Sequence, residues 1–368
     1  MLHLIQDIAT PHNNVVIQAL VHAKQPLTLW YSTDGKQKYG WQEDLTNAVL
    51  PAKMYGTRFV SFKLFAQALK NIFSRQHTYL LVGWMNPTTR ALVLLFWLTR
   101  RPYNMWFDMP NDALTRHPLK KALRTFFYFI LRTSNAHVFC VGNTTVKYFK
   151  DKNFTPQRLT NLPIFVACPT QKEITTLKKD GQILCQKYNI PHKNFLIVAG
   201  SRLVHEKGFD LLITALTHLP THKNINCVII GQGEETKNLS AQITTHKLEK
   251  VVQIIPWLSF HDFQALIAAS NVFNHPARQD AFGATIFAHA LGVPVLGSTG
   301  AGAATDRISH GHNGFLYPAT DTQALAHHIQ TLKNNLELQT ELSQNAYLSA
   351  QNWSPDQAPI ILQKHLLS

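Results

Sequence analysis

The stretch IVAGSRLVHEKGFDLL, residues 197–212, decides the fold of this chain. Its apolar start predicts a buried strand of a parallel sheet, its Gly-Ser pair a turn, and the residues from Phe209 onward an amphipathic helix. Arg202 and Lys207 lie on the connecting loop. Free backbone N–H groups and the dipole at a helix N-terminus favour an anion, and the two cations suit a phosphate or diphosphate. The alternative at this point is an ordinary strand-to-helix turn with two surface cations.

Length and composition indicate a globular chain of about two domains. The chain has 368 residues, of which 45% are hydrophobic and 15% are charged, so there is enough apolar material for sizeable cores. The longest apolar run, Ala91 to Leu98, is much shorter than the roughly 20 residues of a membrane-spanning helix. The N-terminus lacks the basic start and long apolar segment of a signal peptide, so none is expected.

The formal net charge of +14 favours anionic partners, namely phosphorylated small molecules, nucleic acid or an anionic membrane surface. The chain has no zinc-finger spacing, RNA-binding aromatic motif or helix-turn-helix pattern, so we expect no nucleic-acid partner. The four cysteines form no CxxC pair, and the nineteen histidines show no HExxH or comparable spacing. We therefore expect neither a disulfide framework nor a metal site.

Short apolar strands alternate with helical patterns along the whole chain, which predicts βα units and parallel sheets. A polar, Lys-rich helix at 172–188 separates two sets of such units. We therefore expect an N-terminal domain at 1–168, a linker at 169–193 and a C-terminal domain at 194–350.

Three further motifs follow the first loop in the C-terminal half. CVIIGQGE (227–234) predicts a buried strand that ends in a Gly-x-Gly turn, where glycines permit close backbone approach to a ligand. QIIPWLS (253–259) predicts a strand, a turn and a helix capped by Ser259. NHPARQDAFGATIFAHALGVP (274–294) carries an acidic residue and a Phe-Gly pair before a helix, and it ends in a Gly-x-Pro turn.

These motifs, with a small-residue loop at 300–308 and a turn and strand at 311–318, resemble family-4 retaining glycosyltransferases of the GT-B fold. The resemblance implies an α/β fold of two Rossmann-like domains whose parallel sheets face each other across a cleft, with 351–368 crossing back to the N-terminal domain. It implies catalytic roles for Arg202 and Lys207, which hold the diphosphate of a nucleotide-sugar, and for Asp280, which orients the sugar. The implied donor-binding residues are Gly200, Ser201, Gly231, Gly233, Pro256, Trp257, Phe282, Gly283, Ala284 and His289.

The chain departs from the family pattern in its acidic pair. The family has Glu at the position of Asp280 and a second Glu eight residues later, which accepts both ribose hydroxyls. Here eight residues lead to Ala288, whereas counting back from the Gly-x-Pro turn leads to Phe287, because the segment is one residue short. Neither side chain can accept a hydrogen bond. His289 is the nearby polar substitute, and the alternative for this histidine is a structural role on a packed helix.

In the N-terminal half the resemblance is one of architecture. The family's histidine in this domain often follows the strand that here reads NMWFD (104–108), and Phe107 takes its place, so no histidine is carried over. The acceptor-side candidates are Asp108, Asp112 and His12, since loops at the carboxyl ends of parallel strands form ligand sites. The alternative for Asp108 is to cap the next turn.

The segment 116–132 predicts a helix with two faces. One face carries Leu119, Leu123, Phe126 and Ile130. The membrane-contact candidates Lys120, Lys121 and Arg124 lie largely away from it, and basic residues beside clustered aromatic residues fit an interfacial helix on anionic lipid. The alternative is a core-packed helix with a solvated basic face.

The resemblance implies a retaining, metal-independent glycosyltransferase of the hexosyltransferase type. It would transfer a sugar from a nucleotide-sugar to a glycan or lipid-linked acceptor of bacterial lipopolysaccharide, capsule or glycolipid. No cofactor is expected, because Arg202 and Lys207 would stabilise the leaving diphosphate and no DxD metal motif is present. The implied location is cytoplasmic and peripheral, on the inner membrane.

Two alternatives to this function are open. A catalytically weak GT-B homologue could act as a binding or scaffold subunit of a glycan assembly complex, which the missing second carboxylate favours and the intact Arg202 and Lys207 loop opposes. A GT-B phosphorylase would use free phosphate in place of a nucleotide, which the turn at Trp257 mildly disfavours.

Overall fold

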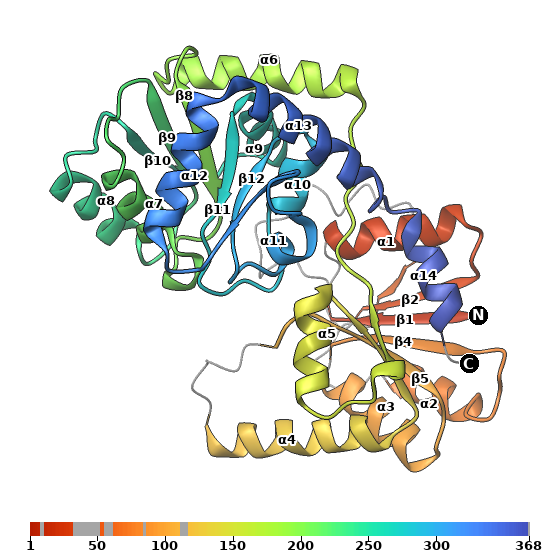
Figure 1. Ribbon diagram of the computed structural model, residues 1–368. Helices are drawn as coiled ribbons and strands as arrows, with labels where there is room; N and C mark the ends of the chain where they lie inside the picture. Colours follow the sequence, from red (N-terminus) through yellow and green to blue (C-terminus); the bar gives the residue numbers. More distant parts are fainter. Residues whose placement is uncertain (8–10, 32–51, 55–61, 84–85, 111–116, 367–368) are drawn as a thin grey trace. The chain divides into compact units, whose positions relative to one another are not determined.

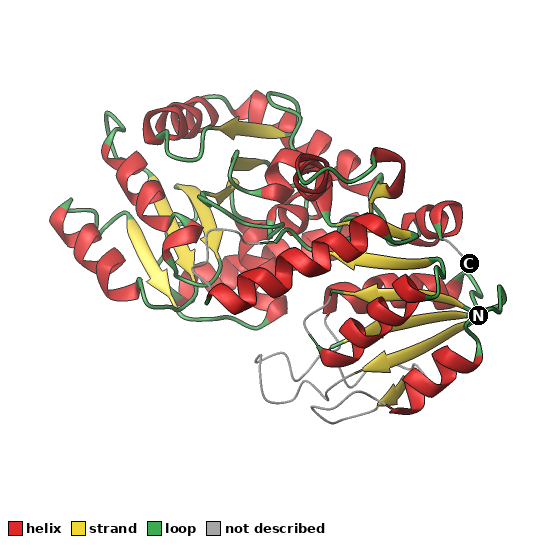
Figure 2. Ribbon diagram, turned by 90° about the horizontal axis from the view of Figure 1, so that it is seen from below, coloured by secondary structure: helices red, strands yellow, loops and turns green. Residues whose placement is uncertain are grey.

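The computed structural model describes residues 1–7, 11–31, 52–54, 62–83, 86–110 and 117–366. The chain divides into two compact units, of which unit 1 comprises Met1–Phe165 with Pro355–Ser368 and unit 2 comprises Val166–Ser354. Each unit is a parallel β-sheet that lies between helices (Figures 1 and 2). The predicted α/β class with parallel sheets is therefore confirmed.

Unit 1 contains, in its described part, a sheet of seven strands in the order β3-β2-β1-β4-β5-β6-β7. The strands are β1 Leu2–Gln6, β2 Leu27–Tyr31, β3 Ala52–Met54, β4 Thr78–Val82, β5 Tyr103–Phe107, β6 Ala136–Cys140 and β7 Leu159–Asn161. The helices are α1 Pro11–His22, α2 Phe62–Lys70, α3 Pro87–Leu98, α4 Pro118–Thr133, α5 Gly142–Asp151, the short η1 Pro156–Arg158 and α14 Gln357–His365. The strand order reverses between β1 and β4.

Unit 2 contains a sheet of six parallel strands in the order β10-β9-β8-β11-β12-β13. The strands are β8 Phe195–Gly200, β9 Ile225–Ile230, β10 Val252–Ile255, β11 Val272–His275, β12 Val295–Ser298 and β13 Gly314–Tyr317. The helices are α6 Gln171–Lys187, η2 His205–Lys207, α7 Phe209–Thr217, α8 Thr236–Thr245, α9 Phe260–Ala269, α10 Thr285–Ala290, α11 Gly302–Arg307, α12 Thr322–Asn334 and α13 Leu336–Gln351.

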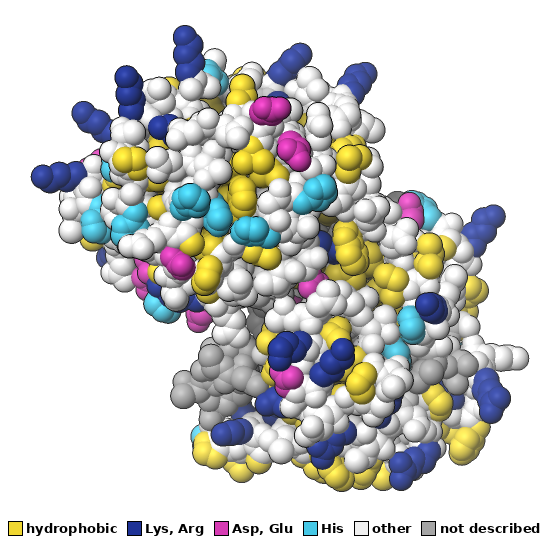
Figure 3. All heavy atoms as spheres, in the orientation of Figure 1, with side chains coloured by type: hydrophobic (Ala, Val, Ile, Leu, Met, Phe, Trp, Pro, Cys, Tyr) yellow, Lys and Arg dark blue, Asp and Glu magenta, His cyan; other side chains and the backbone are white. Residues whose placement is uncertain are grey.

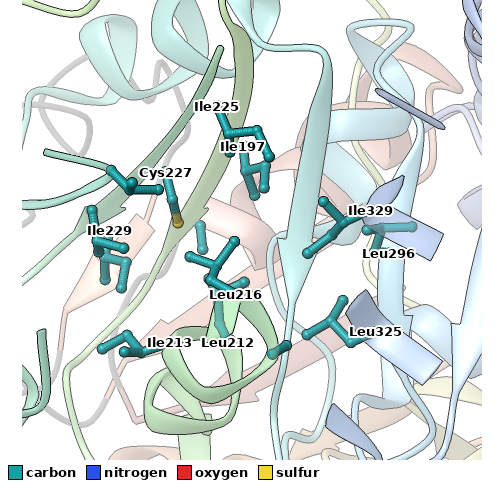
Figure 4. Packing of buried hydrophobic residues seen from close by; sticks show 14 of the residues in the cluster. Ile197, Leu212, Ile213, Leu216, Ile225, Cys227, Ile229, Leu296, Leu325 and Ile329 are labelled. Carbon is teal, nitrogen blue, oxygen red and sulfur yellow. The ribbon is translucent and has the colours of Figure 1, made fainter. Parts of the chain in front are cut away.

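The central strand β8 is buried on both faces of its sheet. Ile197 and Ala199 belong to one hydrophobic cluster, whereas Leu196 and Val198 belong to the other. Figure 4 shows the first cluster, in which strand residues such as Ile197 and Ile229 lie beside side chains of α7 and α12. A fully buried Leu or Ile contributes about 1.5–3 kcal/mol, so this packing fixes the strand ends that carry the candidate site.

The segment predicted as a linker contains α6, which packs against α9 within unit 2. A Cβ at Gly181 would lie 2.1 Å from the carbonyl oxygen of Ala265, so only glycine permits this close helix contact. At the other end of the chain, α14 packs against α1 within unit 1, and His365 stacks on His137 of β6.

The faces of α4 differ from the predicted ones. Leu119 is 74% exposed and Phe126 is 46% exposed, whereas the buried residues are Phe127, Ile130 and Leu131. Phe127, Ile130 and Leu131 belong to the hydrophobic core of unit 1, so the face of α4 that meets the core is turned by about one residue from the predicted one. The predicted apolar face of α4 is therefore largely exposed on the surface of unit 1.

Candidate functional site

Two loops of unit 2 meet at the carboxyl edge of its sheet, one after β8 and the other after β11. The first contains η2 and turns into α7 at Gly208, whose φ of 68° is left-handed. A Cβ at Gly208 would lie 2.1 Å from the carbonyl oxygen of Pro276 in the second loop. Glycine therefore satisfies both the backbone conformation and the close approach of the two loops.

A side-chain ion pair joins the second loop to the first turn of α7, which directly follows the first loop. Arg278 donates through Nη1 to Asp210 Oδ1 at 2.7 Å and through Nη2 to Asp210 Oδ2 at 2.5 Å. Nη1 also lies 3.0 Å from the carbonyl oxygen of His205. Burial raises the pKa of the Asp210 carboxyl, but the hydrogen bonds and charge of Arg278 outweigh burial and hold the pKa below its usual range. A bidentate pair fixes orientation as well as distance, so Arg278 positions η2 against the second loop.

Two of the three residues with predicted catalytic roles are in contact within this frame. Lys207 Nζ lies 2.5 Å from Asp280 Oδ2, and each side chain is 13% exposed. Burial raises the pKa of the Asp280 carboxyl, but the hydrogen bond and charge of His275 and the charge of Lys207 outweigh burial and hold the pKa well below its usual range. Asp280 is therefore a carboxylate at neutral pH, with a cation fixed beside it.

Arg202, the third of these residues, is exposed on the loop between β8 and η2. Its backbone carbonyl accepts the N–H of Val204 at 2.9 Å. Among the described residues, no hydrogen bond or ion pair joins its side chain to Lys207 or Asp280. Its diphosphate contact stays a prediction.

The glycines predicted to bind the donor lie where two turns pack on each other. A Cβ at Gly231 would lie 2.0 Å from the carbonyl oxygen of Ser201, and one at Gly233 would lie 2.1 Å from that of Leu203. Gly200 ends β8 immediately before this contact. The glycines are therefore required for packing between the turns after β8 and β9, and their approach to a ligand stays a prediction.

The remaining donor-binding predictions fall on residues of different exposure. Pro256 and Trp257 follow β10 and are exposed. Phe282 is buried, so its side chain belongs to the core and only its backbone is left for a ligand. Gly283 and Ala284 are partly exposed and lead into α10.

His289 lies inside α10 and is 2% exposed. Burial and the nearby Arg307 cation lower the pKa of its imidazole to about 3. Its Nε2 has no hydrogen-bond partner in the described part of the chain. A neutral ring in the core supports the structural alternative, because a ribose contact would require the ring to leave the core.

The acceptor-side candidates are only partly described. Asp108 is exposed after β5, and its Oδ1 accepts the N–H of Met109 at 2.9 Å, which is the capping contact given as its alternative. Asp112 lies outside the described residues. His12 lies in the first turn of α1, and its side chain is outside the description.

A group of polar side chains that the sequence analysis did not single out lies at the carboxyl end of β1. Asn13 donates to Gln6 at 2.8 Å, and Asn86, the N-cap of α3, donates to Asp7. The strand order of unit 1 reverses here, which is where open α/β sheets bind ligands. The available signal was the position of these polar residues at the junctions of predicted strands and helices.

The structure also distinguishes the two positions at which the second carboxylate is missing. Ala288 is fully buried. Phe287 is partly exposed and lies edge-on to Phe260, with ring centroids 5.3 Å apart. Position 287 is therefore the one from which a carboxylate could reach a ligand.

We predict that Phe287→Glu tightens nucleotide binding by about tenfold or more, because a hydrogen bond to a charged group is worth about 1.5–3 kcal/mol. Calorimetric titration with UDP measures the change. Phe287→Gln is the matched control, since it has the same length without the charge, and it should gain less. Unchanged or weaker binding by a folded Phe287→Glu variant would show that the ribose does not lie beside this residue.

The architecture is that of the GT-B class of glycosyltransferase folds. Residues 182–349 match the model of the family described as Glycosyl transferases group 1. This match confirms the predicted resemblance for the part of the chain that contains both loops.

Individual relatives agree with this assignment. The chain is 32% identical over 114 residues to the O-antigen biosynthesis glycosyltransferase WclY of Escherichia coli, which is 31% of each chain. It is 26% identical over 162 residues to the lipopolysaccharide core biosynthesis glycosyltransferase LpsE of Rhizobium meliloti, covering 44% of this chain and 46% of LpsE. The matches thus span less than half the length of these curated relatives.

A solved structure extends the likeness of fold over both units. The crystal structure of HepE from Anabaena in complex with UDP has a TM-score of 0.75 and 20% identity, and the alignment covers 99% of this chain and 97% of HepE. The predicted GT-B fold is therefore confirmed.

Proposed function

We propose that this chain is a retaining glycosyltransferase that transfers a sugar from a nucleotide-sugar to a surface-glycan acceptor. The observation that carries the proposal is the contact between Lys207 and Asp280, which lies within the residues that match the glycosyltransferase family. A fixed cation beside a carboxylate suits a donor in which an anionic diphosphate is joined to a neutral sugar. The complexes of HepE with UDP and UDP-glucose support this class of donor.

In the proposed reaction, the bond between the anomeric carbon and the diphosphate oxygen breaks, and the acceptor hydroxyl bonds to the anomeric carbon from the same face. The acceptor proton passes to the departing diphosphate oxygen, so no protein nucleophile is required. Lys207 and Arg202 stabilise the negative charge that develops on the leaving group. Asp280 accepts hydrogen bonds from sugar hydroxyls and orients the ring.

Metal independence is part of the proposal, because the two cations supply the charge that a metal would otherwise supply. We expect turnover to be the same in EDTA as in buffer. Loss of turnover in EDTA that Mg²⁺ or Mn²⁺ restores would contradict metal independence without affecting the donor assignment.

Calorimetric titration with UDP, GDP and ADP tests the donor class. We expect one of them to bind and the matching nucleotide-sugar to be hydrolysed slowly without acceptor, with the anomer of the first product, observed by NMR, matching that of the donor. Binding of none would contradict the proposal. Binding without turnover, even with lipopolysaccharide or capsule fragments as acceptors, would favour the scaffold alternative. That alternative is supported by Phe287, which stands where the family pattern has its second Glu.

The acceptor class is proposed from the relatives. WclY is an O-antigen glycosyltransferase and LpsE acts in lipopolysaccharide core biosynthesis. Their acceptors belong to bacterial surface glycans, and we propose the same class here, with a cytoplasmic location at the inner membrane.

We propose that unit 1 contacts an anionic membrane surface through α4. None of the described helices has both the length and the apolar character required to cross a bilayer. Residues 113–150 contain no Asp or Glu. Figure 3 shows hydrophobic and basic side chains together on unit 1 where α4 lies. A shallow groove on this helix is lined by Pro118, Lys121, Ala122, Thr125, Phe126 and Phe129.

The double variant Lys120→Ser/Lys121→Ser should weaken sedimentation with phosphatidylserine vesicles by about tenfold or more, because each such cation contributes about 1 kcal/mol near an anionic surface. Arg124 is left unchanged, because its Nη2 lies 2.9 Å from the Tyr128 hydroxyl and 3.0 Å from the Tyr148 hydroxyl and therefore supports the fold.

The control for this experiment is Lys178→Ser/Lys179→Ser, which removes the same charge from the exposed face of α6 in unit 2. Equal loss of binding in both double variants would show a general charge effect. No vesicle binding by the unmodified protein would rule out the membrane contact.

A further inference from the structure

His275 joins the end of a buried strand to the Asp280 carboxylate. It is the last residue of β11 and is 6% exposed. Its Nε2 lies 3.0 Å from Asp280 Oδ2, and its Nδ1 lies 2.9 Å from the hydroxyl oxygen of Thr285, the first residue of α10. The imidazole ring therefore bridges the end of β11 and the start of α10 across the loop 276–284. It also contacts Asp280 within that loop.

The hydrogen bond between His275 and Asp280 has only one possible direction. A carboxylate oxygen can only accept, so the proton of His275 is on Nε2 and is donated to Asp280. Nδ1 and the Thr285 hydroxyl form the second hydrogen bond of the ring, in which the hydroxyl can donate or accept. Thr285 is fully buried, so the loss of this partner would leave its hydroxyl in the core without the ring as a hydrogen-bond partner.

The space around the contact is closely filled. Gly283 has a φ of 99°, and a Cβ there would lie 2.4 Å from His275 Cε1 and 2.8 Å from Asp280 Oδ2. The backbone of Gly283 therefore covers the contact, and any side chain at this position would displace the ring or the carboxylate. His275 has little freedom to rotate away from Asp280.

Both partners of Asp280 use the same carboxylate oxygen. Lys207 Nζ and His275 Nε2 both contact Oδ2. In the described part of the chain no hydrogen bond is made to Oδ1, and the side chain retains 13% exposure. One oxygen is therefore fixed by protein donors, while the other is available to a ligand.

We infer that His275, held by Thr285, is a positioning residue that orients Asp280 so that Oδ1 accepts a hydroxyl of the donor sugar. This inference rests on the proposed function and deepens it. Asp has one methylene fewer than Glu, so its reach depends more strongly on where the backbone and Oδ2 are held. His275 at the end of β11 and Lys207 in η2 supply that constraint from two different elements.

Two substitutions at position 275 separate the two contacts of the ring. Gln places an amide N–H near the position of Nε2 and keeps the bond to Asp280. The shorter Asn side chain reaches only the position of Nδ1, so it keeps the hydrogen bond to Thr285 and loses the one to Asp280. We expect His275→Asn to lower kcat/KM for hydrolysis of the nucleotide-sugar by about 10–100-fold, as expected for a lost hydrogen bond to a charged group. We expect His275→Gln to recover most of it.

Nucleotide affinity distinguishes a positioning role from a merely structural one. A structural role of His275 would weaken nucleotide binding together with turnover. Asp280 is assigned to the sugar, so the Kd for UDP, or for whichever of UDP, GDP and ADP binds, should stay within about twofold in His275→Asn. Thr285→Val should lower kcat/KM in the same direction by a smaller factor, and Thr285→Ser should not. A folded His275→Asn variant with unchanged kcat/KM, or equal losses in the Gln and Asn variants, would overturn the inference.

A second measurement needs no activity. In protein labelled with ¹⁵N-histidine, the signal lost in His275→Gln should show a proton on Nε2, and it should shift in Asp280→Asn. An Nε2 atom without a proton would overturn the inference. Failure of the unmodified protein to bind any nucleotide would instead contradict the proposed function, so the two failures are distinguishable.

Discussion

Lys207→Ala is expected to lower turnover of the nucleotide-sugar by about 10²–10³-fold, the usual cost of removing one electrostatic partner of a developing charge. Lys207 Nζ lies 2.5 Å from Asp280 and is mostly shielded from water, so its charge acts in a medium that screens weakly. In the variant, Asp280 remains without its cation, and the diphosphate would approach a net negative site. Both effects reduce turnover.

The matched control is Lys237→Ala, which removes an exposed lysine from α8 in the same unit. Lys207→Arg keeps the charge with a different geometry. Its turnover should lie between that of the alanine variant and that of the unmodified protein. Arg202→Ala should also lose turnover. Because Arg202 is exposed, the melting temperature of this variant should equal that of the unmodified protein. Turnover near that of the unmodified protein in Lys207→Ala, with normal donor binding, would contradict the diphosphate assignment.

The fold was predictable because its signals are local. A strand buried on both faces is nearly all apolar, and β8 and β9 appear in the sequence as apolar runs followed by glycine. The faces of α4 were not predictable in the same way. Helical periodicity allowed more than one apolar face, and the core contacts the one that contains Phe127, Ile130 and Leu131, which leaves Leu119 and Phe126 exposed.

The candidate site was predictable where a motif carries charge, and less so where it depends on side-chain contacts. The loop cations and Asp280 follow from sequence, but the clamp between Arg278 and Asp210 joins residues 68 positions apart. His275 ends a strand, a position at which a histidine has many possible roles. Its contact with Asp280 depends on the turn at Gly283, which spacing alone does not specify.

Buried histidines make the stability of both units sensitive to mild acid. Burial, followed by neighbouring cationic or imidazole groups, lowers the pKa of His3 and His137 in unit 1 to about 4. In unit 2, burial and Arg307 lower that of His289 to about 3. The unfolded chain takes up these protons near pH 6.5, before the folded chain does. Stability is therefore highest above pH 6.5 and decreases as the pH falls from 6.5 toward 4.

The free energy of unfolding should fall by about 1.4 kcal/mol per pH unit for each such histidine within that window. Urea midpoints at pH 7.5 and 5.0 measure the loss, which should be several kcal/mol and appear in both units. His289→Leu should reduce the number of protons taken up on unfolding by about one. His192→Leu, at an exposed histidine, should leave that number unchanged. Carboxylates such as Asp280 do not produce the effect, because their pKa values lie below this window. Equal midpoints at the two pH values would show that these rings are protonated, or solvated, in the folded chain.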